Sequence, residues 1–291
     1  MGMSTTTLAA LGLLLNALAW GLSWWPFREL QTLGLHPLWA NTVIYGMAIL
    51  AIFVMRPQAW RGLISVPALW LIALGSGLTN VGFNWAVTVG DVVRVVLLFY
   101  MMPVWSMLLA WLILGERPTK MSVARVLLAV AGVAMVLKAP ESPWPVPNSL
   151  ADWLALMGGF CFALNNAMLR RLRETPGEQR AFAMFFGGAL LSFAIGSIGT
   201  WQGSITPPVM LGGLGWILLI GFAVLFLLSN LTLQYGAARL KASTTSLIML
   251  TEILFATASS VALGVSQLEN RIVLGGSLII AAAIWAAWEE R

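Results

Sequence analysis

Two short segments of the chain carry the same set of polar side chains inside apolar surroundings. Each has a hydroxyl residue, two carboxamides four positions apart and an aromatic residue, namely Thr79, Asn80, Asn84 and Trp85 in the first and Ser229, Asn230, Gln234 and Tyr235 in the second. Residues four positions apart lie on one face of a helix. Because a carboxamide both donates and accepts hydrogen bonds, this stripe is suited to binding a polar molecule. The alternative is that it fastens neighbouring helices together.

Glu252 is the only acidic residue expected deep within an apolar segment. An ionised carboxylate in hydrocarbon costs about 3 kcal/mol or more, so this one must be paired, hydrated or protonated. Two functional interpretations follow: Glu252 binds a cationic group of a substrate, or it takes up a proton in a coupling step. The structural alternative is a protonated carboxyl that bonds to Thr251, Ser243 or a neighbouring helix.

Four further side chains are candidates for the same site: Trp20, Tyr100, Trp105 and Asn165. Trp20 lies too deep in its apolar segment to belong to an interfacial aromatic belt, and Asn165 is equally deep in the sixth segment. Tyr100 and Trp105 flank Pro103, which lacks the N–H that a helix hydrogen bond needs and is therefore predicted to kink its helix. A broken helix of this kind exposes backbone carbonyls that only a cavity or another helix can satisfy.

The composition identifies the elements that must position these residues. The 291 residues are 59% hydrophobic and only 9% charged, whereas a soluble domain has about a quarter charged residues. A membrane-spanning helix needs ~20 mainly apolar residues, and continuous apolar runs of that length exclude the alternating strands of a membrane barrel. The sequence therefore predicts an all-α membrane protein with ten transmembrane helices, near residues 6–27, 35–55, 66–88, 92–114, 120–138, 150–170, 181–200, 211–236, 243–264 and 271–288.

The ten spans divide into two halves. Residues 1–138 are predicted to form a first five-helix repeat, 139–149 a Pro-rich periplasmic linker, and 150–291 a second repeat. Because five is odd, the second repeat crosses the membrane in the inverted direction. Lys241 occupies the position equivalent to Asp91, as inversion requires of loops on opposite sides. Arg94 is expected either to pair with Asp91 at the outer end or to share a solvated loop with it.

The basic residues predict the orientation. Twelve of the 16 Lys and Arg fall in loops on one side, and the positive-inside rule places that side and both termini in the cytoplasm. The predicted location is a bacterial-type cytoplasmic (inner) membrane, crossed many times. This bias also explains the net charge of +5 without any nucleic-acid partner. A monomer is expected, although the glycine pairs at 187–188 and 275–276 would allow close packing within the bundle or between protomers.

Residues for enzyme chemistry are missing from the sequence. The chain has one histidine, His36, and one cysteine, Cys161. It contains no phosphate-binding glycine loop, no cluster of metal ligands and no set of nucleophile, base and acid. The sequence therefore predicts a protein that is not an enzyme and that needs no metal or cofactor.

The chain resembles the EamA-type members of the drug/metabolite transporter superfamily over essentially its whole length. The resemblance rests on the two five-span halves, on Ala19-Trp20-Gly21, and on the fourth span from Pro103 to Gly115-Glu116-Arg117-Pro118. It implies inverted repeats around a central cavity, walled mainly by spans three, four, eight and nine, with one and six gating. Span nine departs from the pattern, because Glu252 stands where a proline is expected.

These observations together predict a secondary transporter that works by alternating access and exports or exchanges small metabolites, with aromatic or neutral amino acids as the first hypothesis. An exporter of lipophilic cations is the second hypothesis, since a carboxylate and aromatic rings attract cations. A non-transporting membrane protein is the third. The predicted substrate-binding residues are Trp20, Asn80, Asn84, Tyr100, Trp105, Asn165, Asn230, Gln234 and Glu252.

Overall fold

The computed structural model describes residues 5–138, 146–237, 239–240 and 248–289, and every regular element within these ranges is a helix. The predicted all-α class is confirmed for this part of the chain. The first half contains α1 (Thr5–Gly21), α2 (Trp24–Thr32), α3 (Pro37–Met55), the short η1 (Ala59–Arg61) and α4 (Gly62–Ser65), α5 (Leu69–Val89), α6 (Val92–Phe99), α7 (Met102–Leu109), the π-helical η2 (Ala110–Leu114) and α8 (Lys120–Leu137). The second half contains α9 (Leu150–Arg171), α10 (Gly177–Trp201), α11 (Gly213–Ala237), α13 (Thr251–Ala262) and α14 (Asn270–Glu289).

Capping residues define several of the helix starts. Asp91 accepts a hydrogen bond from the backbone N–H of Arg94 at 2.8 Å and begins α6. Thr119 accepts one from the N–H of Ser122 at 3.0 Å and begins α8. Such side chains satisfy N–H groups that the first turn of a helix leaves unpaired, so these boundaries follow from the local sequence.

Six helical segments of the described chain are long and apolar enough to cross a membrane: 5–32, 37–55, 92–114, 120–137, 177–201 and 213–233. A seventh is counted if α4 and α5, which meet at a bend of 115°, form one broken span. All of these fall where spans were predicted. Length and composition do not establish the number of ten, because α9 and α13 are not among these segments and Asn270–Ala282 of α14 counts only as a shorter apolar helix.

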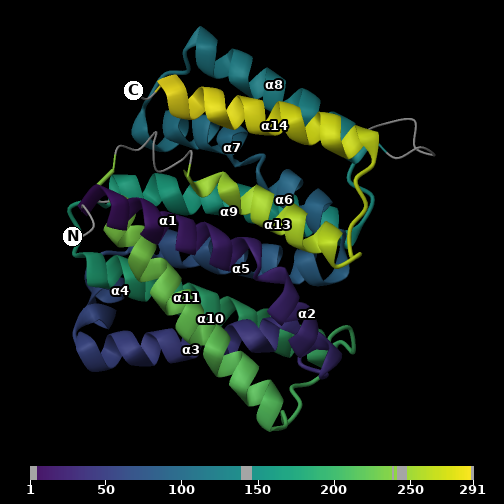
Figure 1. The fold of residues 1–291 in the computed structure, drawn as a ribbon. Coiled ribbons are helices and arrows are strands. Elements are labelled where there is room, and N and C mark those ends of the chain that lie inside the picture. The colour runs from purple at the N-terminus through teal and green to yellow at the C-terminus, as the bar shows by residue number, and fades with distance from the viewer. Residues whose placement is uncertain (1–4, 139–145, 238, 241–247, 290–291) are drawn as a thin grey trace.

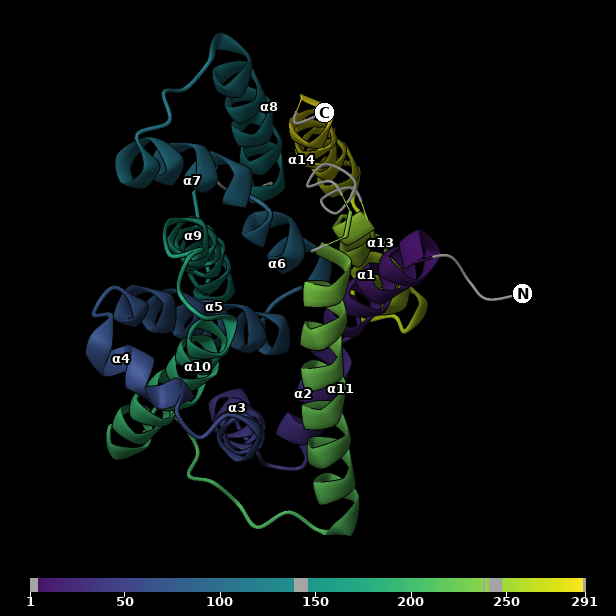
Figure 2. The same cartoon turned by 90° about the vertical axis from the view of Figure 1, so that its left-hand side faces the viewer.

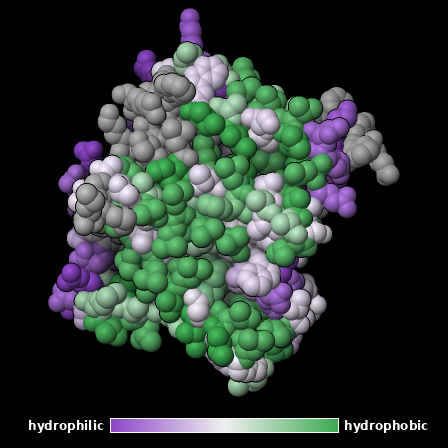
Figure 3. Space-filling model, in the orientation of Figure 1, coloured by the Kyte–Doolittle hydropathy of each residue, from purple (hydrophilic) through white to green (hydrophobic). Residues whose placement is uncertain are grey.

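Most of the helices lie roughly along one direction, with α11 crossing them obliquely, and the ends of the aligned helices form two opposite edges of the molecule (Figure 1). α1 begins at the left edge and α14 ends there, whereas α9 begins at the right edge, so α9 runs opposite to α1. Figure 2 views the bundle from that left edge. Apolar side chains cover most of the visible face, and hydrophilic ones gather mainly at its left and right edges (Figure 3). This band is what a bilayer requires of a multi-pass protein.

Glycines set the closest helix contacts. α5 packs on both α9 and α10, and α8 packs on α14. A Cβ added at Gly132 would lie 2.6 Å from the carbonyl oxygen of Gly275, and one added at Gly77 would overlap the carbonyl oxygen of Gly187. Small residues let helix backbones approach in this way when the hydrophobic effect cannot drive helix association in lipid.

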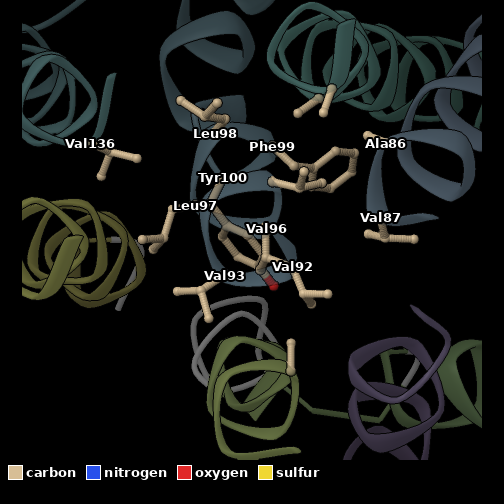
Figure 4. Packing of buried hydrophobic residues seen from close by; sticks show 14 of the residues in the cluster. Ala86, Val87, Val92, Val93, Val96, Leu97, Leu98, Phe99, Tyr100 and Val136 are labelled. Carbon is tan, nitrogen blue, oxygen red and sulfur yellow. The ribbon is translucent and has the colours of Figure 1, made fainter. Parts of the chain in front are cut away.

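The fourth predicted span is interrupted at its centre. Its first part, α6, is buried among apolar side chains from several helices (Figure 4). The α-helix ends at Phe99 and resumes at Met102, so Tyr100 and Met101 form a turn two residues before Pro103, where the sequence predicts the kink. The second half repeats the arrangement, because α13 starts at Thr251, 149 residues after Met102. The glycines that follow these segments, Gly115 (φ 74°) and Gly264 (φ 69°), are also 149 residues apart and both left-handed.

Candidate functional site

A central cavity of about 680 Å³ is lined by residues from both halves of the chain. Sites of this size, ~300–1,000 Å³, are typical for small molecules. The first half contributes α1, α3, α5, the interrupted α6–α7 span and α8, and the second contributes α9, α10, α11, α13 and α14. Because every one of these helices borders the cavity, a change in how they pack would change its shape and access.

The cavity extends to one end of the bundle. Its lining reaches the exposed residues Glu116, Arg117 and Arg170 at that end, which we call the mouth. The lining does not include Arg94 or Asp152 at the opposite end, which we call the closed end. A molecule inside the cavity therefore communicates with one side of the bundle in this structure.

Glu252 and Tyr100 meet inside the cavity. The Tyr100 hydroxyl donates to Glu252 Oε2 at 3.2 Å and also lies 3.4 Å from the carbonyl oxygen of Met249. Both side chains are buried. Tyr100 lies at the interruption between α6 and α7, and Glu252 lies in the first turn of α13, so the two interrupted spans join here. Among the described residues the side-chain partner of Glu252 is Tyr100, and the Thr251 hydroxyl donates instead to the carbonyl oxygen of Ile248, just before α13.

An aromatic wall lies beside this pair. The ring of Trp20 packs edge-on against Phe226, with ring centroids 4.5 Å apart, and against Phe83 at 6.3 Å. All three rings line the cavity, as does Phe99. Edge-to-face contacts of this kind fix ring orientation and add stability beyond burial alone. The cavity thus combines a carboxylate with a rigid apolar surface.

Asn80 belongs to a polar network between α3 and α5. Its Oδ1 accepts a short hydrogen bond from the Tyr45 hydroxyl, and its Nδ2 donates to the carbonyl oxygen of Ser76 at 2.8 Å. All three residues line the cavity. Sequence reasoning did not identify Tyr45 or Ser76. The available signal was that Asn41 and Tyr45, and likewise Ser76 and Asn80, lie four positions apart on single helix faces.

The predicted binding residues separate into three groups. Those that line the cavity are Trp20, Asn80, Tyr100, Asn165, Asn230 and Glu252. Asn84 and Trp105 do not line it. Pro103 and Gln234 lie in described helices, but their side chains are outside the described part of the structure, as are Lys241 and Ser243 entirely.

Asn84, predicted to bind substrate or to fasten helices together, does not line the cavity in this structure. Its Nδ2 donates to Asn41 Oδ1 at 2.8 Å and its side chain is fully buried between α3 and α5. Trp105 also lies outside the lining, and its ring packs edge-on against Phe160 of α9 at 5.5 Å.

Asn16 is a cavity-lining residue outside the predicted set. Its Nδ2 donates to both the hydroxyl (2.6 Å) and the carbonyl oxygen (2.9 Å) of Ser229, joining α1 to α11. Its counterpart in the second half is Asn165, which is 149 residues later and also buried. Among the described residues, nothing hydrogen-bonds the Oδ1 of either carboxamide.

Arg94 holds the closed end together. Its guanidinium binds both carboxylate oxygens of Asp152 at 2.8 and 2.9 Å and donates to the Val136 carbonyl oxygen at 2.6 Å. Both expectations for Arg94, a pair with Asp91 and a solvated loop shared with it, are corrected by this contact, and the Asp91 carboxylate instead caps α6. A bidentate guanidinium–carboxylate pair is among the strongest of side-chain contacts. It connects α6 in the first half with α9 in the second.

A second arginine ties down the same end. Arg28 of α2 donates to the carbonyl oxygens of Val87 at 2.9 Å and Gly90 at 2.6 Å. These carbonyls belong to the C-terminal end of α5, which lacks helical partners and carries partial negative charge. The closed end is therefore built from charge-assisted bonds as well as apolar packing.

Comparisons with known proteins agree with this architecture. A family model described as "EamA-like transporter family" matches the chain twice, at residues 7–138 and 149–288. An uncharacterized transporter of Vibrio cholerae serotype O1 is 27% identical over 125 residues, which cover 40% of this chain and 41% of that protein. The aligned part thus spans about two fifths of that relative. A solved crystal structure shares the fold, with a TM-score of 0.60, 19% identity and 97% of both chains covered.

Proposed function

Because the chain belongs to the EamA-like transporter family, within the drug/metabolite transporter superfamily, we propose that it moves a small molecule across the membrane by alternating access around the central cavity. The observation that carries this proposal is the cavity itself. It is walled by both family repeats, contains a buried carboxylate, and reaches only one end of the bundle. Transporter folds with internal repeats bind substrates at the repeat interface and expose the site to one side at a time.

The proposed architecture is ten spans in two inverted five-helix repeats, residues 1–138 and 150–291, with a periplasmic linker at 139–149. The opposite directions of α1 and α9 support inversion (Figure 1). The mouth carries Arg117 and Arg170, so the positive-inside rule assigns it to the cytoplasm of an inner-membrane protein with both termini inside. In this orientation the structure is open inward.

The substrate class that best fits the lining is a zwitterionic amino acid with an aromatic or neutral side chain. Glu252 meets the ammonium group, the carboxamides of Asn80, Asn165 and Asn230 bond the polar head, and Trp20 with its neighbouring rings accommodates the side chain. Carboxamides suit such a head because they donate and accept. The direction is export or exchange, driven by the substrate gradient or by a proton taken up at Glu252.

An exporter of lipophilic cations is the second candidate, because Glu252 lies in an aromatic surrounding that attracts cations. The positive charge at the mouth disfavours a cationic substrate. Arg117 and Arg170 line the entrance with only Glu116 as an acidic neighbour in the lining there. Positive charge at an entrance raises the local concentration of anions and lowers that of cations, which favours a substrate that carries a carboxylate.

The test is uptake and exchange of labelled phenylalanine in proteoliposomes at two pH values, with Glu252→Gln compared with the wild type. We expect slower transport in Glu252→Gln and loss of its pH dependence. Trp105→Phe is the matched control and should transport normally, since Trp105 lies outside the lining. Phenylalanine flux that is unchanged in Glu252→Gln would make the carboxylate structural. A folded wild type that moves a quaternary ammonium dye but no amino acid would establish the second candidate.

A further inference from the structure

Two pairs of helices occupy equivalent positions in the two halves but pack in different registers. The pairs are α1 with α11, and α9 with α5. Asn16 of α1 corresponds to Asn165 of α9, 149 residues later, and Thr79 of α5 corresponds to Ser229 of α11, 150 residues later. If both pairs packed alike, the bond from Asn16 to Ser229 would be matched by one from Asn165 to Thr79.

The matching bond is not formed in this structure. Thr79 instead donates to the carbonyl oxygens of Gly75 at 2.7 Å and Gly158 at 3.5 Å. Among the residues that the structure describes, Asn165 Oδ1 has no hydrogen-bond partner, although it is buried beside the cavity. Asn16 Oδ1 is unpaired as well, so the halves differ in the amide nitrogen: Asn16 Nδ2 donates across its helix pair to Ser229, and no such bond joins Asn165 to α5 among the described residues.

Glycine contacts show the same difference in register. A Cβ added at Gly12 of α1 would lie 3.1 Å from the carbonyl oxygen of Thr232. The equivalent contact would join Cys161 (12 + 149) to Gly82 (232 − 150). Gly82 instead lies against Leu154 and Gly158, whose backbone atoms would be 2.6 Å and 3.2 Å from a Cβ at Gly82. These residues precede Cys161 by seven and three positions, which is about one to two helical turns.

We propose that the transport cycle exchanges the two registers. In the opposite state, α9 slides along α5 until Asn165 donates to Thr79, while α1 slides along α11 and Asn16 leaves Ser229. This inference rests on the proposed transport function. Discrete shifts of packed helices by about one turn are an established form of conformational switching, and the glycines on both contact lines provide the smooth surfaces that such a shift needs.

The exchange gives each carboxamide a second role. Asn16 and Asn165 both line the cavity, so the one that is not bonded across the helix pair is available to a polar group of the substrate. Asn165 has that role in this structure, and Asn16 has it in the opposite state. A substrate that bonds the available carboxamide stabilises the register in which that side chain has no bond across its helix pair, which links occupancy to the register.

Disulfide crosslinking tests the exchange. In the full-length chain with Cys161→Ala, one variant carries Asn16→Cys and Ser229→Cys, and the other carries Asn165→Cys and Thr79→Cys. Copper phenanthroline should crosslink the first pair rapidly and the second pair more slowly, through the opposite state. Failure of the second pair to crosslink, in protein that shows normal thermal unfolding and a crosslinked first pair, would overturn the proposal. Crosslinking of both pairs in protein that moves no tested amino acid would support the exchange while refuting the proposed substrate.

A second measurement uses leucine, which removes the hydrogen bonds at similar volume. Ser106→Cys in the Cys161→Ala chain reports cavity access to a membrane-impermeant maleimide from the face that carries the mouth. Asn16→Leu should slow labelling by about tenfold, the effect of losing one to two net hydrogen bonds of this state. Asn165→Leu should leave labelling unchanged or faster, because its bond belongs to the other state. Slower labelling in both variants would show a merely structural role and overturn the proposal.

Discussion

Replacing Asp152 with asparagine should open the closed end of the cavity. The carboxylate of Asp152 is 1% exposed and binds Arg94, which is 15% exposed, through two hydrogen bonds. Removing one partner of a buried ion pair costs about 3–5 kcal/mol, because the other charge remains buried. Asparagine keeps one carbonyl acceptor and Arg94 keeps its bond to Val136, so we expect the lower value, about 3 kcal/mol.

The loss of about 3 kcal/mol in Asp152→Asn acts on the equilibrium between the closed and the open state of the Asp152 end. If the pair separates when the closed end opens, the whole loss falls on the closed state. A shift of about 3 kcal/mol then raises the ratio of open to closed by roughly a hundredfold. The assay is labelling of Ser106→Cys, in the Cys161→Ala chain, with an impermeant maleimide applied from the Asp152 face. The rate should rise in Asp152→Asn and fall from the opposite face.

Glu116→Gln provides the matched control. Glu116 pairs with Arg170 at the mouth at 2.6 Å, but the two side chains are 50% and 63% exposed. An exposed pair of this kind contributes at most ~1 kcal/mol, so labelling should change less than about fivefold. If Asp152→Asn lowers the unfolding temperature without changing labelling from either face, the reasoning is refuted. The pair would then stabilise the fold without controlling access.

Three other predictions concern stability. Burial lowers the pKa of His36 to about 4. Between about pH 6.5 and pH 4 the unfolded chain therefore binds a proton at His36 that the folded chain does not bind, so the free energy of unfolding should fall as the pH decreases through this range. His36→Asn, which can still cap α3, should remove this part of the pH dependence of thermal unfolding in detergent. Gly187→Ala should destabilise by about 1–3 kcal/mol, because its Cβ would overlap a carbonyl oxygen of α5. Gly46→Ala, with nothing within 4 Å of its Cβ, should be neutral or stabilising in the same melts. Asn84→Ala should cost about 1–3 kcal/mol by leaving its buried partner unsatisfied, yet leave the KM of transport unchanged; an altered KM would return Asn84 to the binding site.

The sequence was sufficient for the membrane class, the helix interruption near Pro103 and six of the residues that line the cavity, because each depends on local signals. Apolar length predicts a span, and a missing N–H predicts a break. Local signals do not predict the surroundings of Asn84. It shares a helix face with Asn80, but one turn further along α5 the neighbour is Asn41 of α3 rather than the cavity. Helical periodicity predicts which side chains share a face and leaves the identity of the covering helix undetermined.

The closed end could not be predicted for a related reason. Arg94 and Asp152 are 58 residues apart and belong to different halves. Asp91 lies three residues from Arg94, and the sequence left open a pair between them or a shared solvated loop, but the Asp91 carboxylate begins α6. Only the packing of α9 against α6 brings Asp152 to the guanidinium. Charges near helix ends have local and distant uses, and the choice between them depends on tertiary structure.

The Arg94–Asp152 and Glu116–Arg170 ion pairs lie at opposite ends of α9. Asp152 lies in the first turn of α9 and Arg170 in its last turn, where each charge also complements the helix dipole. Arg94 and Glu116, their partners, lie at opposite ends of the interrupted α6–α7 span and the turn that follows it. α9 is thus tied to this span at both ends, and only the tie at the closed end is removed from water. If the cavity opens at the Asp152 end, the Arg94–Asp152 pair becomes hydrated and weak, whereas the Glu116–Arg170 pair is already exposed and contributes little. The buried pair at the closed end is therefore the one that stabilises the state described here.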